Sequence, residues 1–232
     1  MTAYRTALTS AHVTAILFGL TGIFGALIHA SASVITFGRA AFAMLALAVF
    51  ALLQGRALLR GLNRKKLCVY ILSGLMLAAH WVTFFIAIKV GGVAVATLGF
   101  ASFPAFITLL DMAVFRDRPH LAESLLLSLI TLGLVLVTPS FELANQGTVG
   151  LLWGIASGLS FALLAMTNRR ATDGRNGVQV VFWQNATVAV VMAPFAVFDL
   201  MELGRWTGST WQSSVCSARR CPRRYSSRVS RA

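Results

Sequence analysis

The chain has 232 residues, of which 57% are hydrophobic and 12% are charged. Soluble domains carry about 25% charged residues, so this chain has too little polar surface to cover a soluble globule of its size. Its formal net charge is +13. The positive residues gather in short loops and at the C-terminal end instead of forming a basic face, which argues against nucleic acid as a partner and is typical of a membrane protein.

Long apolar stretches follow one another along the chain. A membrane-spanning helix needs about 20 mostly apolar residues. Seven stretches qualify: Val13 to His29, Ser33 to Leu53, Leu67 to Ile88, Gly92 to Phe115, Leu121 to Thr138, Thr148 to Asn168 and Val178 to Phe198. Pro119 and Pro139 bound the fifth stretch. The sequence therefore predicts an all-α integral membrane protein, a polytopic bundle of about seven transmembrane helices.

The loop charges predict the orientation. Positive residues follow the even-numbered spans: Arg56, Arg60, Arg64, Lys65 and Lys66, then Arg116 and Arg118, then Arg169, Arg170 and Arg175. The alternate loops between spans contain Lys89 as their one Lys or Arg. Because Lys and Arg are retained on the cytoplasmic side, we expect a multi-pass protein of the cell inner membrane with a cytoplasmic N-terminus.

The later part of the chain echoes the earlier part. Leu17-Phe18-Gly19-Leu20 aligns with Leu152-Trp153-Gly154-Ile155, and Phe37-Gly38-Arg39-Ala40 aligns with Trp183-Gln184-Asn185-Ala186. A repeating unit of five helices makes the second copy enter from the opposite side, which predicts the inverted repeat of many secondary transporters. The alternative is that any two apolar helices look alike. The expected units are a first repeat at 11–138, a partial second repeat at 148–199 and a basic tail at 204–232.

One segment carries a family resemblance. Phe103-Pro104-Ala105-Phe106-Ile107-Thr108-Leu109-Leu110, followed by Phe115-Arg116-Asp117-Arg118-Pro119, resembles the EamA-type branch of the drug/metabolite transporter superfamily. The resemblance covers roughly Ala11 to Phe198, and Asp117 stands where that family usually has Glu. It implies ten helices in two five-helix halves. It also implies proton- or gradient-coupled movement of amino acids, metabolites or drugs, often outward.

The C-terminal segment departs from that pattern. Gly204 to Ala232 is rich in Ser and Arg and contains no acidic residue. This composition predicts neither a membrane span nor folded structure. We expect a frameshifted or prematurely ended reading frame, the alternative being a genuine basic tail that binds anionic lipid. A second repeat of two helices is expected not to transport and to leave the polar face of Gln184 and Asn185 against lipid.

Four residues predict a substrate pathway. An ionisable group inside a membrane helix costs at least about 2.5–3.5 kcal/mol, so Arg39 and His80 each need a reason to be there. Counted along their spans, the two lie at similar depth in the outer half, with Trp81 next to His80 and Thr97 within reach. An Arg with aromatic neighbours suits a solute bearing a carboxylate or phosphate. The alternative is that Arg39 reaches to the outer interface and His80 hydrogen-bonds a neighbouring helix.

Three more residues are candidates. Pro104 lies about twelve residues into the fourth span and would free a backbone carbonyl near mid-membrane, which only a cavity or a polar neighbour satisfies. Asn185 is a polar residue within the seventh span and is expected to line the same pathway. Asp111, near the inner end of the fourth span, is a candidate for carrying a coupling proton. The alternative for Asp111 is contact with water or an ion pair with Arg116 or Arg118, while Asp117 is expected to cap the fifth helix.

Small residues form a ridge on the sixth span, at Gly150, Gly154, Gly158 and Ala162. Such a ridge predicts close approach of another helix and offers a seam for a homodimer. The four His and three Cys residues show no metal-ligand or disulfide spacing, so we expect no metal, no cofactor and no enzyme activity. The predicted function is transport of a small-molecule solute across the lipid bilayer. A non-transporting membrane scaffold or assembly partner, and less strongly a membrane-embedded enzyme, are the alternatives.

Overall fold

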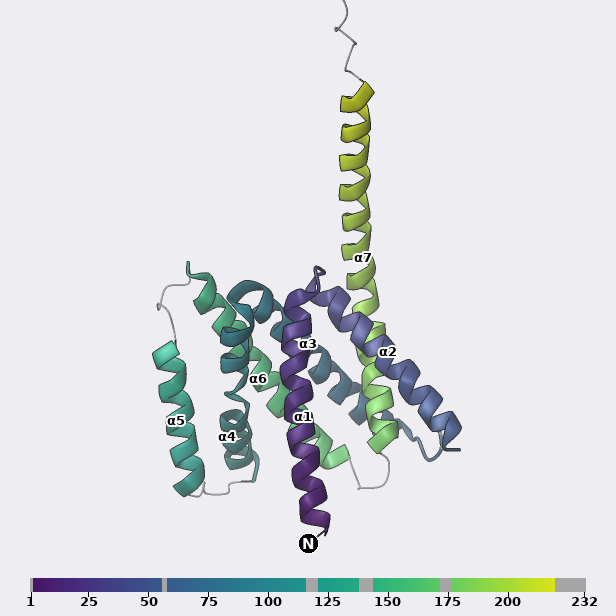
Figure 1. The fold of residues 1–232 in the computed structure, drawn as a ribbon. Coiled ribbons are helices and arrows are strands. Elements are labelled where there is room, and N and C mark those ends of the chain that lie inside the picture. The colour runs from purple at the N-terminus through teal and green to yellow at the C-terminus, as the bar shows by residue number, and fades with distance from the viewer. Residues whose placement is uncertain (1, 56–57, 116–120, 138–143, 172–176, 220–232) are drawn as a thin grey trace, which may run out of the picture.

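The computed structural model describes residues 2–55, 58–115, 121–137, 144–171 and 177–219. Within these residues the chain forms seven helices: α1 (Thr2–Leu27), α2 (Ala32–Leu53), α3 (Arg64–Phe100), α4 (Phe103–Phe115), α5 (Leu121–Val137), α6 (Gln146–Ala171) and α7 (Gly177–Arg219). Five of them are long and apolar enough to cross a membrane. The predicted all-α polytopic membrane bundle is therefore confirmed (Figure 1).

A sharp reversal divides α3. Gly92 has φ +82° inside this helix, a conformation that side-chain-bearing residues rarely adopt. The ring of Phe100 lies 5.0 Å from the ring of His80. In one straight helix, residues twenty apart would be about 30 Å apart. The chain therefore turns back at Gly92, which matches the predicted start of the fourth span.

The predicted continuous fourth helix is wrong. α3 ends at Phe100 and α4 begins at Phe103, so the span from Gly92 to Phe115 is interrupted. The physical reason is Pro104, which has no N–H for the Phe100 carbonyl and whose ring clashes with it. Pro104 is thus the second residue of α4 and not a mid-helix residue. In this first turn a missing N–H costs nothing.

Glycines let α3 and α6 touch backbone to backbone, and this pair shares the most extensive interface of the bundle. A methyl group added at Gly150 would lie 2.5 Å from the Cα of Gly91. One added at Gly154 would lie 2.9 Å from the carbonyl oxygen of Ala96. The predicted ridge is therefore covered within the chain. It is not free to form the homodimer seam that the sequence suggested.

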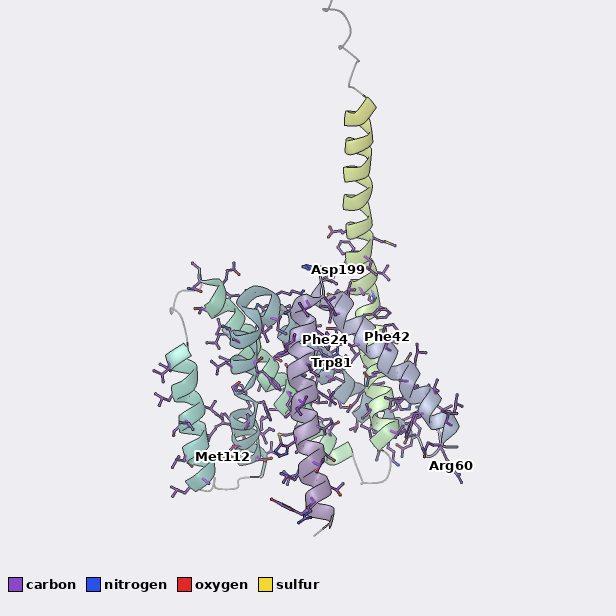
Figure 2. All side chains as sticks on the ribbon, in the orientation of Figure 1. Phe24, Phe42, Arg60, Trp81, Met112 and Asp199 are labelled. Carbon is purple, nitrogen blue, oxygen red and sulfur yellow. The ribbon has the colours of Figure 1, made fainter. Side chains whose placement is uncertain are left out.

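Helices α2 and α7 pack antiparallel, as hydrogen bonds at both ends show. Ser31 Oγ donates to Asp199 Oδ2, on the residue labelled in Figure 2, over 2.5 Å at one end. Gln179 Nε2 donates to the carbonyl oxygen of Leu58 over 2.7 Å at the other. α1 and α6 also run in opposite directions (Figure 1), while the inverted repeat itself stays a prediction.

The polar face of α7 is buried, so the prediction that it contacts lipid is wrong. Gln184 and Asn185 are 4% and 3% exposed. Gln184 Nε2 donates to Ser73 Oγ over 2.9 Å and to Asn168 Oδ1 over 2.5 Å. Helices α3 and α6 therefore supply the partners that we expected only missing helices to provide.

α7 continues past Phe198, where the predicted span ends, through to Arg219. This differs from the unstructured segment predicted from Gly204 onward. The chain contains no proline between Pro194 and Pro222, so no residue there imposes a helix stop. The rest of the predicted tail, residues 220–232, lies outside the described residues. So do Arg116, the predicted cap Asp117 and Arg118.

The glycine contact yields a stability prediction. Gly150→Ala should lower the free energy of unfolding by about 1–3 kcal/mol, because the new methyl group collides with the backbone of Gly91. Unfolding is followed by helical circular dichroism during SDS titration of the purified protein.

Gly133→Ala is the matched control, since a methyl group added there meets nothing within 4 Å. It should be neutral or stabilising by up to about 1 kcal/mol through helix propensity. Unchanged stability in Gly150→Ala would contradict the close α3–α6 interface.

Candidate functional site

Arg39 of α2 stacks on aromatic rings of α3. Its Cζ lies 4.3 Å from the ring centroid of Trp81 and 5.4 Å from that of Phe85. These two aromatic residues are four positions apart, which places them on one face of α3. A desolvated cation–π contact of this kind contributes about 2 kcal/mol. The rings therefore hold the guanidinium at a fixed place inside the bundle.

The guanidinium of Arg39 has no carboxylate partner in the part of the chain that the structure describes. The ion pair recorded there joins Asp111 to Arg169, with 3.5 Å between Oδ1 and the guanidinium nitrogen. A guanidinium carries five N–H donors, and aromatic faces satisfy its charge but not its hydrogen bonds. Arg39 is thus a fixed cation whose donors remain available.

Two cavities meet at Arg39. The groove, of about 460 Å³, lies between α1 and α2 and also reaches Phe85 of α3. The chamber, of about 300 Å³, lies between α1, α2 and α3. The groove is lined by, among others, Phe24, Ile28, Val34, Gly38, Arg39 and Phe42. The chamber is lined by, among others, Phe18, Arg39, His80, Trp81, Thr97 and Phe100. Because both share Thr21 and Arg39, they are stacked along α1 with Arg39 at their junction.

The structure brings together the four residues that the sequence placed at similar depth. Arg39, His80, Trp81 and Thr97 all line the chamber. Thr97 Oγ donates to the carbonyl of Val93 over 2.7 Å, so its lone pairs are the groups left for a ligand. Their role in binding stays a prediction, but the geometry that such a role needs is present.

Hydrogen bonds to α6 fix His80, which is 8% exposed. Ser157 Oγ donates to the carbonyl of His80 over 3.0 Å. His80 Nδ1 lies 2.8 Å from Ser157 Oγ and 3.3 Å from the Ser157 carbonyl oxygen. The hydroxyl has one proton, already given to the His80 carbonyl, and a carbonyl only accepts, so Nδ1 is the donor. In a neutral ring this makes Nε2 a hydrogen-bond acceptor.

A cluster of phenylalanines surrounds the His80 ring. Its centroid lies 5.0 Å from Phe100, 5.0 Å from Phe161 and 6.1 Å from Phe84. Phe103, the first residue of α4, stacks on Phe100 at 5.1 Å. The break before Pro104 thus borders the chamber wall even though Pro104 itself is not a lining residue.

The sequence did not single out the two α6 residues that hold His80. Ser157 and Phe161 are four residues apart and face α3 together. The small-residue ridge indicated a close helix contact there, and Ser157 lies directly before Gly158. What the ridge did not show was which residue of the other helix stands opposite.

The other predicted site residues lie apart from the two cavities. Asn185 Nδ2 donates to the carbonyl of Val181 over 2.8 Å, and its buried Oδ1 has no partner among the described residues. Asp111 forms its ion pair with Arg169 of α6. An ion pair was one of the alternatives for Asp111, although the expected partners, Arg116 and Arg118, lie outside the described residues.

Comparison with known families decides the class of protein. Residues 5–138, more than half of the chain, match the EamA-like transporter family. The chain belongs to that family. The match contains Arg39, His80, Trp81 and Thr97, and it ends where the first five-helix unit was expected to end. The EamA family consists typically of transporters and not of enzymes. No match was found among curated proteins or among solved structures.

The His80–Ser157 pair yields a testable coupling. Ser157→Ala should destabilise the protein by about 0.6–1.7 kcal/mol, the range of hydrogen bonds between membrane helices. In a His80→Leu background the cost should shrink, because the imidazole partner is already gone. The free energy of unfolding in SDS is measured for the unaltered protein, for each single variant and for the double variant.

Ser160→Ala is the matched control, since the hydroxyl of Ser160 donates to the carbonyl of Ala156 within its own helix. The loss of unfolding free energy caused by Ser160→Ala should be the same with and without the His80 side chain. Equal costs of Ser157→Ala in both backgrounds would show that the side chains are not coupled.

Proposed function

We propose that this EamA-family membrane protein moves a small anionic solute and that Arg39 binds the anionic group. The observation that carries the proposal is a guanidinium without a carboxylate partner, fixed on Trp81 at the junction of two cavities. A planar guanidinium binds carboxylate or phosphate through two parallel hydrogen bonds. An anion at Arg39 would satisfy donors that the aromatic rings leave unused.

The other chamber residues suggest a second feature of the solute. His80 offers Nε2 as an acceptor once Nδ1 is held by Ser157. Thr97 likewise offers acceptor lone pairs. A solute with an anionic group and an N–H or O–H donor, such as an amino acid or a hydroxy acid, would match both kinds of group in the chamber.

The remaining assignments are proposals that accompany this function. We propose inner-membrane location with a cytoplasmic N-terminus, a first five-helix repeat at 11–138 and a partial second repeat at 148–199. Export and homodimerisation stay predictions from the sequence. For Asp111, the ion pair with Arg169 supports a link between α4 and α6 more than a coupling proton. Pro104 and Asn185 are proposed to shape the pathway from outside its lining.

If the protein is a scaffold, the charge of Arg39 has no ligand to bind. A scaffold needs the helix surfaces and has no use for a ligand-accessible cation. Removal of the Arg39 charge would then leave every solute interaction unchanged. Binding of small anions to the reconstituted protein distinguishes the two functions, and it does so whether or not this chain completes a transport cycle.

The test uses methanesulfonate, a small permanent anion, and dimethyl sulfone, its neutral near-isostere. In lipid nanodiscs, methanesulfonate should bind the unaltered protein, and Arg39→Gln should weaken binding about tenfold or more, as expected for lost charge-assisted hydrogen bonds. Arg39→Lys should retain part of the affinity, since an ammonium cannot form the bidentate pair. Saturation-transfer NMR of the probe methyl groups provides the dissociation constants.

Arg5→Gln removes an exposed positive charge of α1 far from both cavities and is the matched charge control. It should bind methanesulfonate like the unaltered protein, and dimethyl sulfone should not bind in an Arg39-dependent way. Equal methanesulfonate affinity in Arg39→Gln and the unaltered protein would refute the proposed anion site. The same preparations in sealed vesicles measure flux of the anion.

A further inference from the structure

We infer that the solute bound by Arg39 is an anion with a single apolar chain, and that it enters sideways from the bilayer through the groove between α1 and α2. The inference rests on the proposed function, because it takes Arg39 as the anion site. It adds the class of solute and its route. The feature that carries it is an apolar groove that ends on a guanidinium.

The lining of the groove suits a hydrocarbon chain. Phe24 of α1 and Ile28, directly after α1, face Val34 and Phe42 of α2 across it, and its polar side chains are Thr21 and Arg39. A hydrophilic metabolite would lose its water there without gaining hydrogen-bond partners. An alkyl or aryl chain has no hydrogen bonds with water to lose. The volume of about 460 Å³ lies within the range of small-molecule sites, about 300–1,000 Å³.

The groove opens toward lipid. Phe42 is 76% exposed and Phe24 is 58% exposed, and Figure 2 shows them on α2 and α1. On a membrane-spanning helix, exposed apolar side chains contact acyl chains. α1 rests on α3, where Gly25 approaches Phe85 closely, instead of resting on α2. The two sides of the groove are therefore not packed together.

Charge complementarity selects the occupant. Among the residues that the structure describes, Arg39 is the one charged residue that lines the groove, and none of them gives it a carboxylate. An amphiphilic anion that partitions into the bilayer reaches the groove with its chain already in hydrocarbon. Its head then meets Arg39 at the mouth of the chamber. A cationic or neutral amphiphile would fit the groove but not its charged end.

Gly38 gives a way to fill the groove without removing Arg39. This glycine lines the groove, and a side chain added there meets nothing within 4 Å at its first carbon. Gly38→Phe should therefore occupy the space of the apolar chain. Gly133→Phe, at an equally open position on α5, is the matched control. Gly38→Leu is a smaller second filling variant, and circular dichroism checks that all three fold.

The probes are octanesulfonate and methanesulfonate, permanent anions that differ in chain length, with octyltrimethylammonium as a cation of the same tail. Binding is measured in zwitterionic nanodiscs, and only the part of it that Arg39→Gln abolishes is assigned to the anion site. Gly38→Phe should weaken octanesulfonate binding about tenfold or more, because the chain is excluded from the groove. Methanesulfonate binding should be weakened much less, because this anion has no chain that would occupy the groove. Octyltrimethylammonium should show no Arg39-dependent binding in any variant.

The outcomes separate the two claims. Methanesulfonate binding that depends on Arg39, with octanesulfonate affinity unchanged in Gly38→Phe and Gly38→Leu, would overturn the groove and leave the anion site intact. If neither sulfonate binds the unaltered protein more tightly than it binds Arg39→Gln, the proposed function is overturned instead. If phosphatidylglycerol competes for the site as strongly per mole as octanesulfonate does, the groove binds membrane lipid, and the proposed single-chain solute is overturned.

Discussion

The contact between the backbones of α3 and α6 determines where the candidate site forms. Gly91 meets Gly150 and Gly99 meets Gly154, so α6 lies against both limbs of the reversed helix. In a membrane, helices associate through such close packing, because lipid removes the hydrophobic driving force. The reversal at Gly92 returns the chain alongside its own first limb. As a result, Phe100 and Thr97 face the same cavity as His80 and Trp81.

Arg39 shows how the bundle manages a buried cation. A charge within a membrane helix is costly and is usually paired or held by aromatic and polar groups. Here α3 provides the rings of Trp81 and Phe85, while no described carboxylate neutralises the guanidinium. A structural role alone would be better served by a salt bridge or by an apolar residue. A cation kept in place with its donors available is the arrangement that an anion-binding protein needs.

The sequence predicted the features that depend on distance along a helix. Residue counting with a fixed rise put Arg39 and His80 at one depth, and the structure places both around one chamber. It did not predict which face of a helix meets which neighbour, because that depends on how all helices pack together. Ser157 was missed and Gln184 was assigned to lipid for this reason. The break before Pro104 was missed because a proline is tolerated in a membrane helix as either a kink or an interruption.

The most direct test of the account is the NMR signal of the Arg39 guanidinium in nanodiscs, followed through its Nε–H resonance. The Trp81 ring should displace this signal from those of the other arginines, and Arg39→Lys should remove it, which assigns it. Methanesulfonate should move the signal in a saturable way, while dimethyl sulfone should leave it unchanged. A signal that is displaced equally in Trp81→Leu, or that does not respond to the anion, would contradict an anion site built on Arg39 and Trp81.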